Sequence, residues 1–141
     1  MSYQVCKPGK LKITLAIAYS LMILISSVIP MDQGIDSTIW VLSFTPEIQN
    51  LLHIPVFTIL TILWLQILKD FGIPPIKRIL IALVTAIGFG ILNEIIQGFI
   101  PGRYPAAMDI AFNSFGVFGG ILVFYFSERM RPGFIRRVVC G

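Results

Sequence analysis

The sequence predicts an all-α membrane protein, a bundle of four transmembrane helices with both termini in the cytoplasm. Of its 141 residues, 56% are hydrophobic and only 13% are charged, whereas a soluble domain is about half apolar and about a quarter charged. The apolar residues form four long runs, and the basic residues are concentrated in only some of the segments between them. A single integral membrane domain over residues 1–141 is therefore expected.

Each apolar run is long enough to cross a bilayer, which takes about 20 residues with a range of roughly 17–25. Spanning segments of this kind are helices, because hydrocarbon offers the backbone no hydrogen-bond partners. The first run follows three lysines, as a signal peptide would, but no small-x-small cleavage site follows it, so we expect it to be retained. The runs, taken in order, are residues 13–29, 51–68, 79–100 and 110–126.

The basic residues predict the orientation. With four spans, ten of the eleven Lys and Arg residues fall on the side that holds both termini, and Arg103 alone falls on the other side. Such a bias places the basic side in the cytoplasm. The net charge of +4 then reflects topology and the anionic inner leaflet, so no nucleic-acid partner is expected. No metal-ligand spacing such as CxxC or HxxxH occurs, and no cofactor is expected.

Polar residues interrupt the last three runs, and they do so near the outer ends. At about 1.5 Å per residue, Glu94 lies roughly 9 Å below the end of its run and Asn113 roughly 6 Å below the start of its helix. Three helices thus contribute polar groups to one layer in the outer third of the membrane. Ionisable residues at such depths are costly and mark functional sites by default. The residues of this layer are His53, Glu94, Gln97, Asp109 and Asn113.

The third and fourth helices each carry a stripe with polar residues at the outer end and small residues deeper. Small residues allow two helices to approach closely, so we expect these helices to pack along their stripes and their polar ends to converge. Pro101 ends the third helix and Gly102 permits the turn that follows. The stripes are Ala82, Ala86, Gly90, Glu94 and Gln97 on the third helix, and Asp109, Asn113, Gly116 and Gly120 on the fourth.

Each polar residue has a structural interpretation beside the functional one. Glu94 is either a reactive carboxylate or a structural one paired with a neighbouring cation. Gln97 and Asn113 either contact a ligand or bridge helices by hydrogen bonds. Asp109 either belongs to a site or caps the fourth helix. Arg103 either reaches phospholipid headgroups or binds an anionic ligand.

The pattern of these residues along the chain resembles that of the VanZ-like family of small bacterial membrane proteins. The departures lie around the histidine: the uncharged stretch 49–52 (QNLL) precedes it where the family often has an Asp-Lys pair, Ile54 follows it where Phe is frequent, and Phe57 stands where Tyr is common. The resemblance implies a multi-pass protein of the bacterial cytoplasmic (inner) membrane and a link to glycopeptide resistance, since VanZ itself is associated with reduced susceptibility to teicoplanin. The matching positions are His53, Glu94, Gln97, Phe99, Pro101, Gly102, Arg103, Asp109, Asn113, Gly116 and Gly120.

The first functional hypothesis is an enzyme that acts at the outer leaflet on a membrane lipid or a lipid-linked envelope molecule. A carboxylic acid in the layer would serve as general acid or base, with the histidine as its proton partner, and the guanidinium would hold an anionic headgroup. The catalytic residues would be Glu94, His53 and Asp109. The substrate-binding residues would be Arg103, Gln97 and Asn113.

Three further hypotheses remain open. The same pocket could bind a lipid tail or an amphiphilic antibiotic without turning it over. A proton-coupled drug exporter is less favoured, because transporter sites usually lie near the bilayer midplane and Glu94 lies near one surface. A structural anchor or partner of another membrane protein would not need polar residues on one side only. Neither the substrate nor the oligomeric state follows from the sequence.

Overall fold

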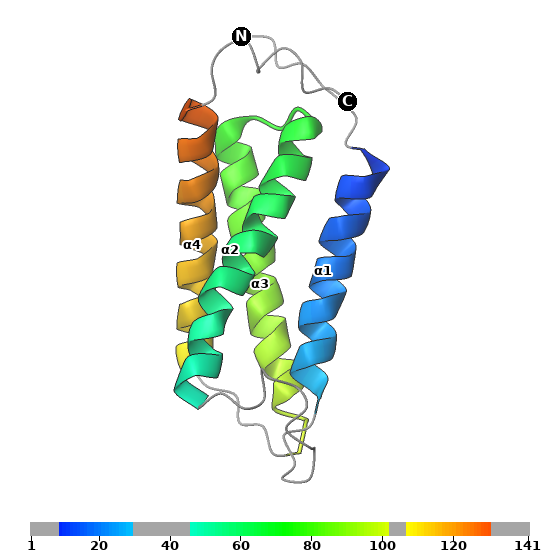
Figure 1. Cartoon of the computed structure of the whole chain (residues 1–141), viewed down its shortest axis with the longest axis vertical. Coiled ribbons are helices and arrows are strands. Elements are labelled where there is room, and N and C mark those ends of the chain that lie inside the picture. The colour runs from blue at the N-terminus through cyan, green and yellow to red at the C-terminus, as the bar shows by residue number, and fades with distance from the viewer. Residues whose placement is uncertain (1–8, 30–45, 102–106, 131–141) are drawn as a thin grey trace.

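The computed structural model describes residues 9–29, 46–101 and 107–130, and in these ranges it contains helices and turns but no strands. Four helices lie side by side in one bundle (Figure 1), and each is long and apolar enough to cross a membrane. The predicted fold class is confirmed: the chain has the architecture of a multi-pass membrane protein. The helices are α1 (Lys10–Val28), α2 (Pro46–Asp70), α3 (Pro75–Gln97) and α4 (Ala107–Met130).

Most helices extend beyond their apolar runs. α1 begins at Lys10 and α4 continues to Met130, because charged side chains at helix ends can reach the headgroup region. α3 begins at Pro75, whose fixed φ suits the first helical position. Its other end comes earlier than expected, at Gln97, where the backbone loosens into turns with shorter hydrogen-bond spacing. Pro101 accounts for this early end, because the residue before a proline avoids the helical conformation.

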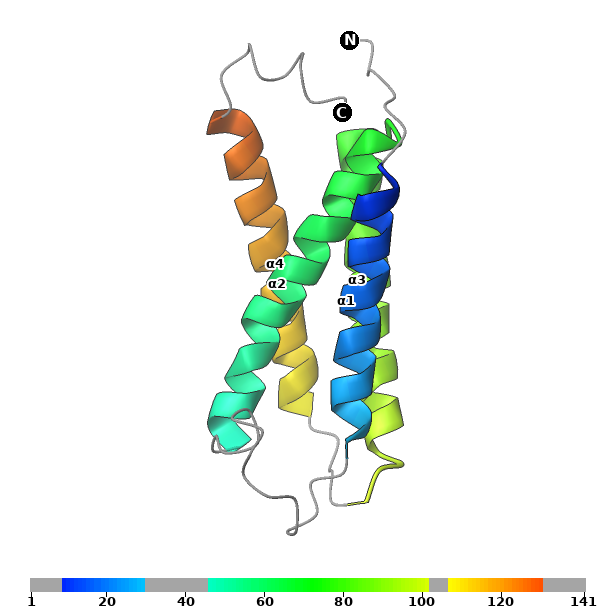
Figure 2. The ribbon, with the colours of Figure 1, turned by 45° about the vertical axis from the view of Figure 1, so that its right-hand side comes forward.

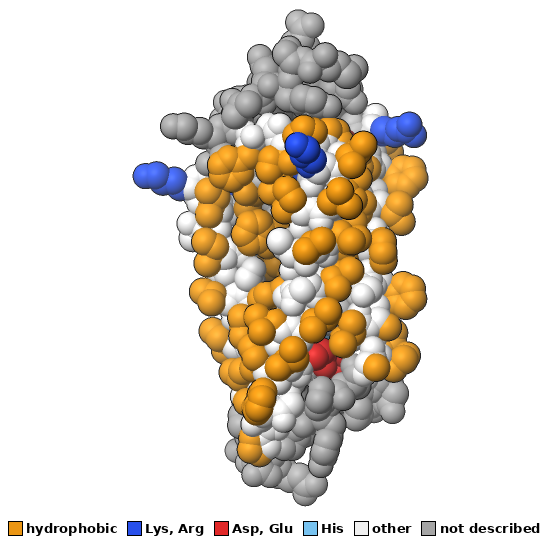
Figure 3. Space-filling view, turned by 180° about the vertical axis from the view of Figure 1, so that it is seen from behind, with side chains coloured by type: hydrophobic (Ala, Val, Ile, Leu, Met, Phe, Trp, Pro, Cys, Tyr) orange, Lys and Arg blue, Asp and Glu red, His pale blue; other side chains and the backbone are white. Residues whose placement is uncertain are grey.

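The helices alternate in direction, so the start of α1 and the end of α4 lie at the same end of the bundle (Figure 1). We call it the basic end and the opposite end the polar end. Two ion pairs, Lys12–Asp70 at 2.7 Å and Lys69–Glu128, join α1 to α2 and α2 to α4 there. Figure 3 shows basic side chains beside the upper part of a broad apolar surface. All Lys and Arg residues of the described ranges lie at the basic end: Lys10, Lys12, Lys69, Lys77, Arg78 and Arg129.

Hydrogen bonds from the end of α2 and from the start of α3 stabilise the turn between these two helices. Gly72 has a φ of 71°, which glycine adopts without strain, and the N–H of Ile73 bonds to the carbonyl of Leu68, as at many helix C-termini. Arg78, near the start of α3, is buried. Its Nη2 donates to the carbonyl oxygen of Ile73 at 2.9 Å, and its guanidinium lies 5.9 Å from the ring centre of Phe124 in α4.

Two clusters of buried apolar side chains form the core. One cluster draws on all four helices and the other, nearer the basic end, on α2, α3 and α4. Most other large apolar side chains point outward, as expected where the surroundings are hydrocarbon rather than water. The first cluster contains Ile23, Phe57, Leu60, Ala86 and Val117, and the second contains Leu65, Ala82 and Phe124.

Gly116 and Gly120 bring α4 directly against α2. An ideal Cβ on Gly116 would lie 2.5 Å from the carbonyl oxygen of Ile54, and one on Gly120 would lie 2.8 Å from that of Thr58. The hydroxyl of Thr58 also donates to the carbonyl oxygen of Gly116 at 3.0 Å. Figure 2 shows the two helices crossing near their midpoints. Backbones approach this closely only where a side chain is missing.

The expected packing of the third helix against the fourth is therefore confirmed only in part. α3 meets α4 where Gly90 contacts Asn113. The prediction was wrong for Gly116 and Gly120, which face α2. Helical periodicity identifies the buried face of a helix, but it does not identify the neighbour that covers this face.

Gly116→Ala should destabilise the bundle by about 1–3 kcal/mol, because the new methyl group collides with backbone atoms of α2 that cannot move independently. Gly88→Ala is the matched control, since a Cβ there meets no atom within 4 Å. Thermal unfolding in detergent measures both variants. Equal midpoints for Gly116→Ala and Gly88→Ala would contradict the close contact of α2 and α4.

Candidate functional site

The polar end contains a layer of buried polar side chains. α3 turns one face inward along its whole length, and this face changes from small residues to polar ones near the polar end. Asn93, Glu94 and Gln97 are all buried there, with Glu94 only 3% exposed. The predicted stripe on α3 is confirmed as a buried face. Asn93 lies beside it and adds a carboxamide.

His53 and Asn113 are joined by a hydrogen bond of 2.8 Å between Nδ1 of the ring and Oδ1 of the amide. Because an amide oxygen can only accept, this bond requires a proton on Nδ1 and leaves Nε2 as the acceptor of the neutral ring. Phe57 stacks on the histidine ring, with 6.3 Å between ring centres. The histidine is thus fixed both in orientation and in tautomer.

α2 begins earlier than the sequence suggested, but His53 stays near the polar end of the candidate span Asn50–Asp70. α2 begins at Pro46 instead of residue 51, so His53 lies about 10 Å along the helix from its first residue, at about 1.5 Å per residue. The helix starts earlier because polar residues outside hydrocarbon can still be helical, although an apolar run does not include them. At this depth the histidine ring reaches the level of Asn113 in α4.

Asn113 is enclosed by α2 and α3. It is 1% exposed, and its Nδ2 has no hydrogen-bond partner among the described residues. A Cβ added to Gly90 would lie 2.9 Å from this Nδ2 and 3.2 Å from the ring of Phe57. Gly90 therefore provides the space that the amide occupies. The layer holds one buried amide donor that the described residues do not satisfy.

α1 contributes to the layer through Ser27, which sequence reasoning missed. Its Oγ donates to Oδ1 of Asn93 at 2.6 Å, and both residues are buried. The polar layer therefore involves all four helices rather than three. A serine at the end of an apolar run is common in membrane helices, so no pattern in the sequence distinguishes Ser27 from Ser26 beside it.

The two carboxylates of the layer lie at the facing ends of α3 and α4. Glu94 is in the last turn of α3, and Asp109 is buried in the first turn of α4. α4 begins at Ala107, so Asp109 lies inside the first turn, and of its two interpretations the capping one does not match its position. A carboxylate there still interacts favourably with the helix dipole.

The turn after α3 is described only in part. Pro101 is exposed in the turn that follows the helix. Gly102 and Arg103, predicted to form the turn and to hold an anion, lie outside the described residues. Within the described ranges, no three His, Cys, Asp or Glu side chains come together in a way that could hold a metal ion.

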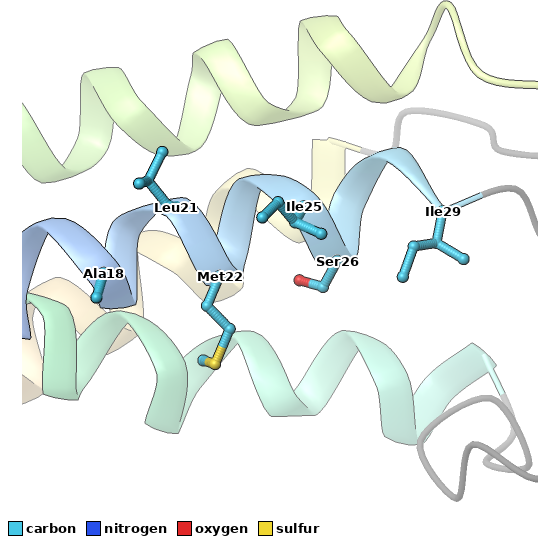
Figure 4. Close-up of a pocket in the computed structure, with 6 residues that line it drawn as sticks. All are labelled: Ala18, Leu21, Met22, Ile25, Ser26 and Ile29. Carbon is cyan, nitrogen blue, oxygen red and sulfur yellow. The ribbon is translucent and has the colours of Figure 1, made fainter.

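A hollow of about 510 Å³ lies along α1 (Figure 4), and it is not part of the polar layer. The described residues that line it come from α1 and from Ile29 directly after it, so the described chain provides no opposite wall. A wide, one-sided apolar surface of this kind is what a lipid-facing helix presents. The lining residues are Ala18, Leu21, Met22, Ile25, Ser26 and Ile29.

The fold and the layer together define a class: a four-helix multi-pass membrane protein with polar side chains buried at one end of the bundle. Comparisons with protein-family models, with curated proteins and with solved structures found no match.

The tautomer of His53 can be measured directly, because it is the only histidine of the chain. In ¹⁵N-histidine-labelled protein at a pH where the ring is neutral, we expect a protonated Nδ1 and an unprotonated Nε2. Asn113→Leu removes the acceptor and should move the proton towards Nε2. Gly90→Ala displaces the amide and should cause a smaller shift of the proton towards Nε2. A spectrum that neither variant changes would contradict the bond.

The link between α1 and the layer can be tested by a double-mutant cycle with Ser27→Ala and Asn93→Ala. We expect a coupling free energy of about 0.6 kcal/mol, with about 1.7 kcal/mol as the upper bound for hydrogen bonds between membrane helices. Ser26→Ala paired with Asn93→Ala is the control, since Ser26 lies on the exposed side of α1. Coupling that is zero in both cycles would exclude the Ser27–Asn93 bond.

Proposed function

We propose that the chain is a VanZ-like protein of the bacterial cytoplasmic membrane that binds the polar head of an envelope lipid or lipid-linked amphiphile at its polar end. One observation carries the proposal: buried polar side chains of α1, α3 and α4 and the partly buried His53 of α2 gather at this end. A bundle needs no such layer to hold together, because apolar and small residues already pack its other half. Intramembrane polar clusters usually mark binding or transport sites.

The distribution of basic residues supports a position of this layer at the outer leaflet. Every described Lys and Arg lies at the opposite end, and basic residues favour the cytoplasmic side. In this orientation the polar end meets the lipids and lipid-linked molecules of the outer face. Arg103, which the sequence assigns to the same side, would add a bidentate donor for a phosphate or carboxylate.

Two features of the layer suit recognition of an oxygen-rich head. The Nδ2 of Asn113 is a buried donor without a partner among the described residues, and such a donor costs free energy until an acceptor reaches it. The bond from His53 to Asn113 leaves Nε2 as an acceptor, so the ring can receive a hydrogen bond from a ligand hydroxyl.

If the protein also transforms its ligand, Glu94 is the residue to move the proton. A carboxyl group in a buried layer can act as general acid or base when a ligand group comes within hydrogen-bond reach. His53, with a free acceptor nitrogen, is then the proton partner. Binding without turnover needs only the shape and the hydrogen bonds of the layer, so the two activities differ in their need for ionisation.

The proposed phenotype is reduced susceptibility to lipoglycopeptides such as teicoplanin. The support is the match to the VanZ-like pattern from Glu94 to Gly120. A protein that modifies or occupies an outer-leaflet amphiphile changes the surface on which a membrane-anchored drug acts. The phenotype thus follows from either activity.

Glu94→Gln keeps the shape of the side chain but removes its ionisation, and it separates the two activities. If Glu94 is the general acid or base, the rate of turnover should fall by about 10²- to 10⁴-fold and resistance should be lost, whereas binding alone should survive. The measurement is teicoplanin susceptibility of a host expressing each variant at equal level. Glu128→Gln is the matched control, since this glutamate pairs with Lys69 at the basic end.

Mass-resolved envelope lipids from the same strains complete the test. A lipid or peptidoglycan precursor that changes with the wild-type chain but not with Glu94→Gln supports an enzyme. Resistance without any changed species contradicts an enzyme and supports binding. Full resistance in Glu94→Gln, Asn113→Leu and His53→Ala together would show that the polar layer is not the site.

A further inference from the structure

A second cavity, separate from the polar layer, lies between α1, α2 and α3 near the middle of the bundle. Its volume is about 250 Å³. An engineered cavity of about 150 Å³ inside another protein is enough to take up benzene, so this one has room for a segment of hydrocarbon chain. The described lining residues are Ser20, Leu60, Trp64, Thr85, Ala86 and Phe89.

The walls of this cavity are mostly apolar, and the two hydroxyls among them use their protons within their own helices. The hydroxyl of Ser20 donates to the carbonyl of Ala16, and that of Thr85 donates to the carbonyl of Ile81, each within its own helix. Of the described lining side chains, only Trp64 keeps a polar N–H for which the structure gives no hydrogen bond. A buried water takes about three polar partners. The cavity therefore suits an apolar occupant.

The cavity reaches the side of the bundle. Thr85 lines it and is exposed at the surface of α3, at the depth of the bilayer hydrocarbon. Ile23, which is buried in the same cluster as Leu60 and Ala86, lies between the lining residue Ser20 and the layer residue Ser27 along α1. An acyl chain can therefore enter the cavity from the side, between helices.

We propose that this cavity binds one acyl chain of a membrane phospholipid whose head lies at the polar end. At about 1.5 Å per residue, the lining residue Phe89 lies about 6 Å from Asn93 along α3, and Ser20 lies about 10 Å from Ser27 along α1. A lipid held by its tail in the cavity thus has its head one to two helical turns away, at the layer. The position of the head rests on the proposed function; the site for the tail rests on the cavity alone.

Trp64 reports on the cavity directly. The chain has two tryptophans, so Trp40→Phe leaves Trp64 as the only fluorophore of this kind. The purified protein in excess detergent is titrated with phosphatidylglycerol that carries dibrominated acyl chains, because bromine quenches tryptophan only on contact. We expect quenching that saturates at a low concentration of brominated lipid. Unbrominated phosphatidylglycerol should displace this lipid and reverse the quenching.

Ser20→Leu fills the cavity and should abolish the saturable quenching, whereas Ser26→Leu adds the same side chain on the exposed side of α1 and should preserve it. If Ser20→Leu does not fold, Thr85→Leu fills the same space from α3. Quenching that rises in proportion to the brominated lipid without saturating, and equally in both leucine variants, would overturn the proposal.

Asn113→Leu separates the two proposals. Saturable quenching that needs a higher lipid concentration for half-saturation in this variant supports both the tail site and a head at the polar layer. Saturable quenching that Asn113→Leu leaves unchanged supports the tail site and contradicts the position of the head. Absence of saturation overturns the tail site whatever the susceptibility assays show for Glu94→Gln.

Discussion

Polar groups in hydrocarbon have only one another as partners, and the arrangement of this bundle depends on that constraint. Water cannot satisfy a carboxamide buried between helices, so each such group requires a partner from a neighbouring helix. Ser27 meets Asn93 across α1 and α3, and His53 meets Asn113 across α2 and α4. These two bonds join the helices in two pairs at the polar end, where they fix which side chains face one another.

The histidine bond in turn depends on the close contact of α2 and α4. These helices run in the same direction, and Gly116 meets Ile54 one turn beyond the pair of His53 and Asn113. A bulkier residue at this position would separate the helices and lengthen the bond. The glycines thus act on the site through backbone distance, although none of them carries a functional group.

Much of the fold could be predicted from the sequence, because four apolar runs and uneven charge leave few alternatives. The buried faces of α3 and α4 followed from helical spacing, and Asn113 was correctly placed in the polar layer. The neighbour of Gly116 could not be predicted, since a short connection suggested α3 while the chain packs it on α2. Ser27 could not be found either, because a single hydroxyl in an apolar run carries no periodic signal. Contacts between helices depend on three-dimensional packing, which spacing along one helix does not encode.

The central claim is that the polar layer receives the head of a membrane amphiphile. The most direct measurement is an experimental density map of the protein in lipid nanodiscs, at a resolution that shows bound lipid. The account predicts density for a polar head against Asn113 and Glu94. Ordered lipid confined to the outer surfaces of the helices, with the layer closed by side chains alone, would contradict it.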